Sequence, residues 1–242
     1  APLSQRAGYW PFHKVIDWLR RGTPIQTFRQ RVAEHRSTVR GLVVTARSVA
    51  EYGLTLPQRF SSPLFAVWNF TNRCNLRCRH CYLGDAGSTD LDPGILEALL
   101  DGFDDMGGLR LMITGGEPLL YPGFSALNEA LTGRSFRPVL ITNGTLLHRE
   151  DIASLNFMEI QFSVDGLEDG HDHLRGRGSF SKVMESLRAA LSAGMDVSVA
   201  TVIHARNLGE LEGLGAMLSE MGVSAWNGGR PVSASYKIAP RA

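Results

Sequence analysis

From residue 64 onward, short apolar segments of the chain alternate with longer amphipathic ones. The short segments are flanked by turn residues and are typical of buried strands. The predicted strands are 64–70, 109–114, 138–142, 159–164, 196–203 and 223–227. The segments between them repeat their apolar residues at helical spacing. The predicted helices are 92–106, 124–131, 149–155, 179–194 and 207–222.

Strands that are separated by helices pair in parallel through right-handed crossovers, so the pattern predicts an α/β fold. In such a sheet the loops after the strands carry the chemistry. Four unusual sequences occupy these places: a cysteine-rich stretch (69–87), TGGEP (114–118), TNG (142–144) and SVDG (163–166). An open doubly wound sheet would concentrate its glycine-rich signal after one strand, so motifs after four strands favour a barrel.

The first 60 residues have a different pattern. A short amphipathic helix is predicted to end at Gly22, and a longer helix is predicted over 24–52. The apolar residues of the longer helix recur at helical spacing and predict one buried face. They are Ile25, Phe28, Val32, Val39, Leu42, Val43, Ala46 and Val49. We therefore expect a helical extension (1–60), a barrel (61–232) and a tail (233–242).

The net charge of +1 hides an asymmetry. Residues 1–63 carry ten Lys or Arg and three Asp or Glu, a net charge of +7, and the remainder carries −6. Arg29, Arg36, Arg40 and Arg47 align along one flank of the long helix. This basic row either docks on the acidic remainder or stays solvated, as charge rows commonly do, or it contacts an anionic membrane surface or an acidic partner.

The composition, with 43% hydrophobic and 20% charged residues, is that of a globular protein with a sizeable core. The sequence has no apolar run long enough to span a bilayer and no signal-peptide pattern. Secreted chains usually pair their cysteines, so the cysteine usage predicts a reducing, cytoplasmic location. Nothing in the sequence predicts binding to nucleic acid.

All three cysteines lie in CNLRCRHC, as Cys74, Cys78 and Cys81. A structural zinc site has four ligands and a disulfide two, so three thiols suit neither. A [4Fe–4S] cluster normally takes one cysteine per iron, and three thiolates would leave one iron open. S-adenosylmethionine could chelate that iron through its amine and carboxylate. A zinc site that adds His80 is the alternative, but His80 and Cys81 are adjacent and would face apart.

At these residues the chain resembles the radical S-adenosylmethionine (radical SAM) enzymes, over about 64–231. The resemblance implies a partial (β/α)6 TIM-like barrel and a [4Fe–4S] cluster on the three cysteines. It places Ser163 and Asp165 near the ribose and carboxylate of S-adenosylmethionine, and Arg175 at the carboxylate. The implied cofactor-binding residues are His80, Gly115, Gly116, Glu117, Thr142, Asn143, Ser163, Asp165, Arg175 and Thr201.

The resemblance also implies a reaction. One electron from the cluster cleaves S-adenosylmethionine, and the 5′-deoxyadenosyl radical abstracts hydrogen from a substrate. The pattern is most similar to the SPASM-type branch, which includes haem-biosynthesis and peptide- or cofactor-maturing enzymes. The implied partners are a flavodoxin- or ferredoxin-like electron donor and a peptide or small-molecule substrate. Relatives carry auxiliary clusters in a C-terminal extension, but no cysteine follows Cys81, so a single cluster is expected.

A second hypothesis comes from another functional class. The chain could be a non-catalytic iron–sulfur or zinc protein whose basic N-terminal arm recruits a partner. Reductive formation of 5′-deoxyadenosine would separate this hypothesis from the enzyme.

Overall fold

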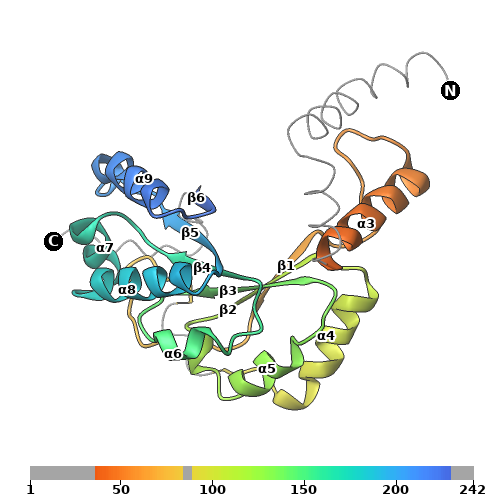
Figure 1. Ribbon diagram of the computed structural model, residues 1–242, viewed down its shortest axis with the longest axis horizontal. Coiled ribbons are helices and arrows are strands. Elements are labelled where there is room, and N and C mark those ends of the chain that lie inside the picture. Colours follow the sequence, from red (N-terminus) through yellow and green to blue (C-terminus); the bar gives the residue numbers. More distant parts are fainter. Residues whose placement is uncertain (1–35, 84–88, 230–242) are drawn as a thin grey trace.

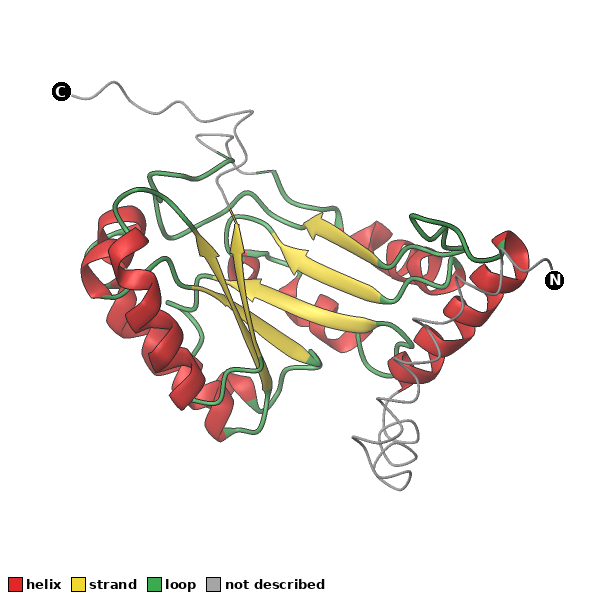
Figure 2. Ribbon diagram, turned by 90° about the horizontal axis from the view of Figure 1, so that it is seen from above, coloured by secondary structure: helices red, strands yellow, loops and turns green. Residues whose placement is uncertain are grey.

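The computed structural model describes residues 36–83 and 89–229. Six parallel strands form one sheet in the order of the sequence, β1-β2-β3-β4-β5-β6, and the sheet curls into an open half-barrel (Figure 2). The strands are β1 Phe65–Asn69, β2 Arg110–Thr114, β3 Arg137–Thr142, β4 Glu159–Ser163, β5 Asp196–Val202 and β6 Ala225–Gly229. The predicted class, a partial TIM-like barrel, is confirmed.

The helices lie on the outer face of the sheet (Figure 1). They are α4 Leu96–Asp105, α5 Phe124–Ala130, α6 Arg149–Ile152, α7 Glu168–Arg175, α8 Ser179–Ser192 and α9 Leu211–Glu220. Three 3-10 turns accompany them: η1 Pro93–Ile95, η2 Pro118–Leu120 and η3 Leu208–Glu210. The helix α7 was not predicted, because its eight residues include a glycine and few apolar side chains.

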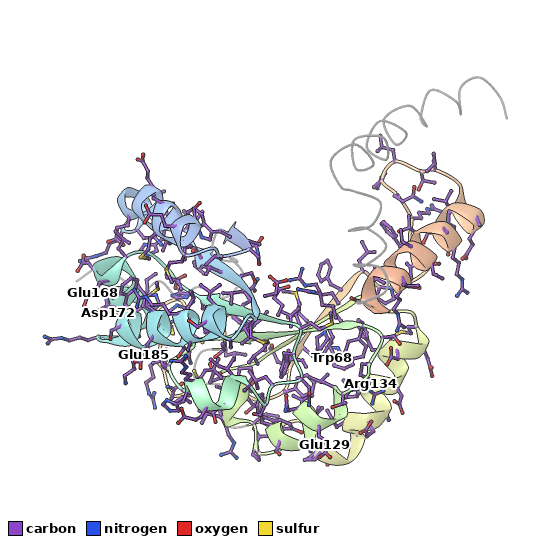
Figure 3. The ribbon with its side chains drawn as sticks, in the orientation of Figure 1. Trp68, Glu129, Arg134, Glu168, Asp172 and Glu185 are labelled. Atoms are coloured by element: carbon purple, nitrogen blue, oxygen red, sulfur yellow. The ribbon has the colours of Figure 1, made fainter. Side chains whose placement is uncertain are left out.

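Two apolar clusters fill the space between the sheet and its helices. The first joins β1–β3 to α4 and α5; there the ring of Trp68 packs against Phe70 and Phe103 at centroid distances of 6.1 and 6.0 Å (Figure 3). The second joins β4 and β5 to α8 and α9 and includes Phe162 and Leu187. Because side chains alternate along a strand, the opposite face of each strand lines the interior of the half-barrel.

Ion pairs link the starts of four neighbouring strands. Glu159 of β4 accepts hydrogen bonds from Arg110 of β2 at 2.5 Å and Arg137 of β3 at 3.2 Å. Ser198 of β5 donates to the same carboxylate at 2.7 Å, and Arg137 also pairs with Asp196. This end of the barrel is therefore closed by structural contacts, and the opposite end, where the predicted motifs lie, is left for chemistry.

The N-terminal extension is described from α3, Arg36–Tyr52, onward; the predicted helix before residue 23 lies outside the described residues. The predicted apolar face of α3 was wrong in part. Val39, Leu42 and Val43 are exposed, whereas Val44 is buried. Ser48 is also buried, and its hydroxyl accepts a hydrogen bond from the Ser61 N–H at 3.0 Å.

The position of Arg40 explains this orientation of α3. Arg40 pairs with Asp104 of α4 at 2.5 Å, so this member of the basic row docks on the acidic part of the chain. The side chains of Arg29 and Arg36 lie outside the described residues, and Arg47 is exposed. Among the described residues, no helix combines the length and apolar character needed to cross a membrane.

Candidate active site

The cysteine loop leaves β1 and rests against the end of α7. The Arg79 N–H donates to the Leu174 carbonyl at 2.8 Å, and the Cys81 N–H donates to the Cys78 carbonyl at 3.1 Å. The three cysteines are free thiols; Cys74 and Cys81 are exposed and Cys78 is half-buried. The loop therefore presents three thiols from one short, backbone-anchored turn.

The three thiols do not converge on a single metal ion. Within 36–83 and 89–229, no three His, Cys, Asp or Glu side chains converge closely enough to hold one metal ion. Burial raises the pKa of Cys78 to about 11 and also raises the pKa of Cys74. Burial therefore favours the neutral thiols, and coordination to a metal would favour the thiolates.

His80 contacts the loop after β4 through one ring nitrogen. Its Nε2 lies 3.3 Å from Asp165 Oδ2, and its side chain is mostly buried. The zinc alternative required His80 as a fourth ligand beside the three cysteines. Among the described residues, no group of three His, Cys, Asp or Glu side chains that includes His80 converges on one ion, which does not support the zinc alternative.

The glycine pair of TGGEP, Gly115 and Gly116, packs against the start of the cysteine loop. Gly115 has φ +153°, and a Cβ there would lie 2.3 Å from the Thr71 carbonyl oxygen. A Cβ on Gly116 would lie 2.3 Å from the Arg73 carbonyl oxygen. The close approach lets the Gly116 N–H donate to Thr71 at 2.8 Å and the Glu117 N–H donate to Arg73 at 2.7 Å. The loop after β2 thus anchors the residue before Cys74.

The Glu117 side chain turns inward and is fully buried. One carboxylate oxygen accepts from Thr142 Oγ1 at 2.8 Å, and the other accepts from the Asn143 N–H at 2.9 Å. Burial raises the pKa of Glu117 to about 7 despite these hydrogen bonds. Glu117 and Thr142 therefore join the ends of β2 and β3.

Asn143 lies beside the first cysteine. Its Nδ2 is 3.0 Å from Asn75 Oδ1 and 3.9 Å from Cys74 Sγ. Its Oδ1 accepts from the backbone N–H and the hydroxyl of Thr145. The loop after β3 thus contacts the cysteine loop through Asn143, whose amide nitrogen and amide oxygen are both hydrogen-bonded.

Asp165 is the centre of the polar network after β4. Its Oδ2 accepts from Arg175 Nε at 2.7 Å and lies close to His80, and its Oδ1 accepts from the Val202 N–H at 2.8 Å. Burial by itself would raise the pKa of Asp165, but the Arg175 guanidinium, with His80 and the Val202 N–H, holds it below its usual range. The network thus contains a buried carboxylate, Asp165, and a guanidinium, Arg175, that donates to it through Nε.

The last two predicted residues differ in position. Ser163 is half-buried on the interior face of β4. Thr201 is buried; its hydroxyl donates to the Val164 carbonyl at 2.6 Å and accepts from Trp226 Nε1 at 2.8 Å. The structure thus brings His80, Asp165 and Arg175 together, and it uses Thr201 to tie neighbouring strands.

Three residues of this network were not predicted. His171 Nδ1 accepts from the Asp165 N–H at 3.2 Å, and burial lowers the pKa of His171 to about 4. Asn207 is fully buried, and its Nδ2 donates to the carbonyls of Asp165 and Val202 at 2.7 and 2.9 Å. Glu210 accepts from the N–H groups at the start of α7. The only sequence signal was an Asn shortly after a strand, which predicted a helix start.

Comparisons with known proteins identify the family of the chain. The family model of the Radical SAM superfamily matches residues 68–218. The chain is 28% identical over 178 residues to the antilisterial bacteriocin subtilosin biosynthesis protein AlbA of Bacillus subtilis, covering 69% of this chain and 39% of AlbA. It is 29% identical over 161 residues to Fe-coproporphyrin III synthase of Methanosarcina barkeri, covering 64% and 40%. Over 173 residues it is 30% identical to the mycofactocin maturase MftC of Mycobacterium tuberculosis, covering 67% and 44%.

Solved structures show the same fold. Streptococcus suis SuiB bound to S-adenosylmethionine matches with a TM-score of 0.66 at 20% identity, covering 76% of this chain and 44% of SuiB. The structure of anSMEcpe with bound AdoMet and the Kp18Cys peptide matches with a TM-score of 0.62 at 20% identity, covering 70% and 52%. The chain spans less than half the length of the three curated relatives named above.

The family match covers more than half of the chain, from β1 to α9. It includes the cysteine loop, the glycine pair and the Asp165 network. The chain therefore belongs to the radical SAM superfamily, whose enzymes use a [4Fe–4S] cluster together with S-adenosylmethionine.

Proposed function

We propose that Cys74, Cys78 and Cys81 hold one [4Fe–4S] cluster and that the Asp165 network binds S-adenosylmethionine beside it. When bound, these two cofactors supply a 5′-deoxyadenosyl radical by one-electron cleavage, and the radical abstracts hydrogen from the substrate. The observation that carries the proposal is that Arg79 and His80, both within the cysteine loop, contact α7 and Asp165 respectively. The cluster ligands and the predicted cofactor ligands are thus parts of one packed unit.

The side chains have separate tasks in this proposal. Arg175 binds the methionine carboxylate with the part of its guanidinium that Asp165 does not hold, because a planar fork matches a carboxylate. Asn143 fixes the cysteine loop at Cys74, and Glu117 fixes the end of β3. Ser163 lies on the interior face, where its hydroxyl is available to the ribose. The three free thiols suit a reducing compartment, and we propose the cytoplasm.

We further propose a substrate in cofactor, haem or peptide maturation. The curated relatives support it, since AlbA and MftC are named for bacteriocin biosynthesis and for maturation, and a third is a coproporphyrin synthase. The anSMEcpe structure, which shares the fold, was solved with a bound peptide. For the domains, the Arg40–Asp104 pair supports an extension (1–60) that packs on the barrel (61–232). Membrane contact through the extension stays a prediction.

Anaerobic reconstitution with iron and sulfide tests the proposal. The wild-type chain should bind about four irons and form 5′-deoxyadenosine when dithionite and S-adenosylmethionine are present. Cys78→Ala should lose both the iron and the product. Tyr82→Phe, in the same loop, is the matched control and should retain the iron. Full iron content in Cys78→Ala would disprove the ligand assignment, and iron without 5′-deoxyadenosine in the wild type would favour a non-catalytic iron–sulfur protein.

A further inference from the structure

Three cationic or titratable side chains form a basic rim beside the cysteines: Arg79, His173 and Arg206. Arg79 lies between Cys78 and Cys81, and its Nη1 is 3.5 Å from His173 Nε2 on α7. Arg206 follows β5 and comes from the turn in which its N–H donates to His204 Nδ1 at 3.1 Å. Glu168 and Asp172, labelled in Figure 3, mark the helix that carries His173.

Contacts with Asp165 place Arg79 and Arg206 on one surface. His80, which follows Arg79, lies 3.3 Å from Asp165 Oδ2. Asn207, which follows Arg206, donates to the Asp165 carbonyl at 2.7 Å.

The electrostatics of His173 agree with this placement. Burial lowers the pKa of His173, and the charges of Arg206 and Arg79 lower it further, whereas Asp169 acts in the opposite direction. Both guanidinium groups are therefore close enough to repel a proton on the same imidazole. Arg79 and Arg206 are themselves exposed.

The rim is not neutralised within the part of the chain that the structure describes. Arginines that stabilise the fold face a carboxylate: Arg40 pairs with Asp104, Arg110 with Glu159 and Arg175 with Asp165. Among residues 36–83 and 89–229, no ion pair joins Arg79 or Arg206 to an Asp or Glu within 4.0 Å. Two exposed arginines that are not ion-paired give this surface a local positive charge, which attracts an acidic partner.

We propose that Arg79, His173 and Arg206 form the docking surface for an acidic electron-donor protein of the flavodoxin or ferredoxin type. The inference rests on the proposed function, because the cluster must receive its electron from outside the chain. Arg79 is separated from Cys78 by no residue and from Cys81 by one, so a protein that docks on the rim lies next to the cluster. In the transfer, the donor loses one electron and the cluster gains it, and no bond forms or breaks.

The size and chemistry of the rim suit this kind of partner. Weak redox encounters bury small interfaces and depend on charge complementarity for their association rate. A short-lived complex also lets the oxidised donor leave after each electron. An acidic substrate peptide is the competing occupant, and the experiment separates the two.

The test compares two reductants on the reconstituted enzyme. Arg79→Glu, Arg206→Glu and the double variant are supplied with S-adenosylmethionine and with either photoreduced flavodoxin or dithionite. Arg188→Glu is the matched control, because Arg188 is an exposed arginine on α8. At low ionic strength and at the same flavodoxin concentration, the double variant should form 5′-deoxyadenosine at least tenfold more slowly than the wild type. The Arg206→Glu variant, whose substituted residue lies outside the cysteine loop, should keep its dithionite-driven rate and its iron content at the wild-type values.

Salt supplies a second readout. The flavodoxin-driven rate of the wild type should fall as salt rises, because the Debye length shortens to ~8 Å at physiological ionic strength. The double variant should lose most of this dependence, and Arg188→Glu should keep it. A charge effect behaves in this way, and a change in folding does not.

Three results would overturn the proposal. Equal flavodoxin-driven rates in the wild type and the double variant would remove the rim from electron transfer. An equal loss with both reductants would mean that the rim acts on the cluster or on S-adenosylmethionine. A defect that appears only when an acidic substrate peptide is added would assign the surface to the substrate. If the wild type forms no product with either reductant, the proposed function itself fails, which the dithionite arm reveals separately.

Discussion

Arg175 Nε donates to Asp165 Oδ2 at 2.7 Å, and this contact joins the last residue of α7 to the loop after β4. Asp165 is inaccessible to solvent, so without Arg175 its charge would lack its strongest partner. The contact also restricts the guanidinium to one orientation. Arg175 thus has two separable roles, one in folding and one in binding the cofactor.

A double variant separates these roles. Arg175→Ala should lower the free energy of unfolding, by about 3 kcal/mol, because it leaves a buried carboxylate without its cation. It should also weaken S-adenosylmethionine binding tenfold or more, as expected for a lost charged hydrogen bond. Arg175→Ala/Asp165→Asn should recover much of the stability without recovering the affinity. Urea unfolding and calorimetric titration measure the two quantities.

Arg177→Ala is the control for these variants, since Arg177 is exposed two residues further on. It should change neither stability nor affinity. Recovery of affinity in the double variant would show that Arg175 acts only by neutralising Asp165.

Glu210 fixes the other end of α7. Its carboxylate accepts from the N–H groups of Leu167 at 2.7 Å and Gly170 at 3.0 Å. A Cβ on Gly170 would lie 2.3 Å from Glu210 Oε2, so this glycine makes room for the carboxylate. Glu210→Ala should therefore cost about 1–2 kcal/mol of unfolding free energy, as loss of a helix cap does, and Glu212→Ala on α9 should cost little.

The effect of Gly170→Ala on stability should change sign when Glu210 is removed. In the wild-type background it should destabilise the protein, because the new methyl group meets Glu210. In the Glu210→Ala background it should be neutral or stabilising, since alanine favours a helix by about 1 kcal/mol over glycine. Urea unfolding of the four proteins measures the coupling, and additive effects would show that Glu210 does not occupy the space beside Gly170.

The sequence predicted the sheet well and the site only in part. All six strands were predicted within two residues of their ends. The inner strands β2–β5 contain buried apolar residues, which are typical of parallel strands. Asp92 was correctly predicted as a helix cap, and it accepts from the Gly94 N–H at 2.9 Å. By contrast, the start of α7 is held by Glu210, which lies 40 residues after Gly170 in the sequence, so local periodicity carried no sign of this helix. For the same reason Asn207 was missed: its role exists only where β4 and β5 end side by side.

The helix α3 shows a second limit. Periodicity predicted that Val43 faces the core, but tertiary contacts of Arg40 and Ser48 rotate the helix so that Val44 is buried and Val43 is 59% exposed. Val44→Asp should therefore destabilise the packing of α3, by several kcal/mol, because it buries a charge without a partner. Val43→Asp should be tolerated within about 0.5 kcal/mol. Hydrogen exchange of α3 and urea unfolding measure the difference, and the reverse ranking would restore the predicted face.

Glu117 makes stability depend on pH. Burial raises its pKa from 4.5 to about 7, so between these values the folded chain binds a proton that the unfolded chain releases. The stabilisation is complete below pH 4.5 and is lost as pH rises through about 7. His171 acts in the opposite direction, because burial lowers its pKa from 6.5 to about 4 and its contribution is lost as pH falls through that range.

The Glu117→Gln variant isolates the carboxyl from the imidazole. Glutamine stays neutral, whereas His171 contributes equally to both proteins and cancels from their difference. The stability of the wild type relative to Glu117→Gln should fall by about 2–3 kcal/mol between pH 5 and pH 8, in line with the raised pKa. Urea unfolding of the metal-free chains measures it, since a bound cluster would add its own stabilisation. A difference that stays constant over this range would mean that Glu117 ionises in the folded protein as it does in water, and that the ends of β2 and β3 are joined around a carboxylate that solvent reaches.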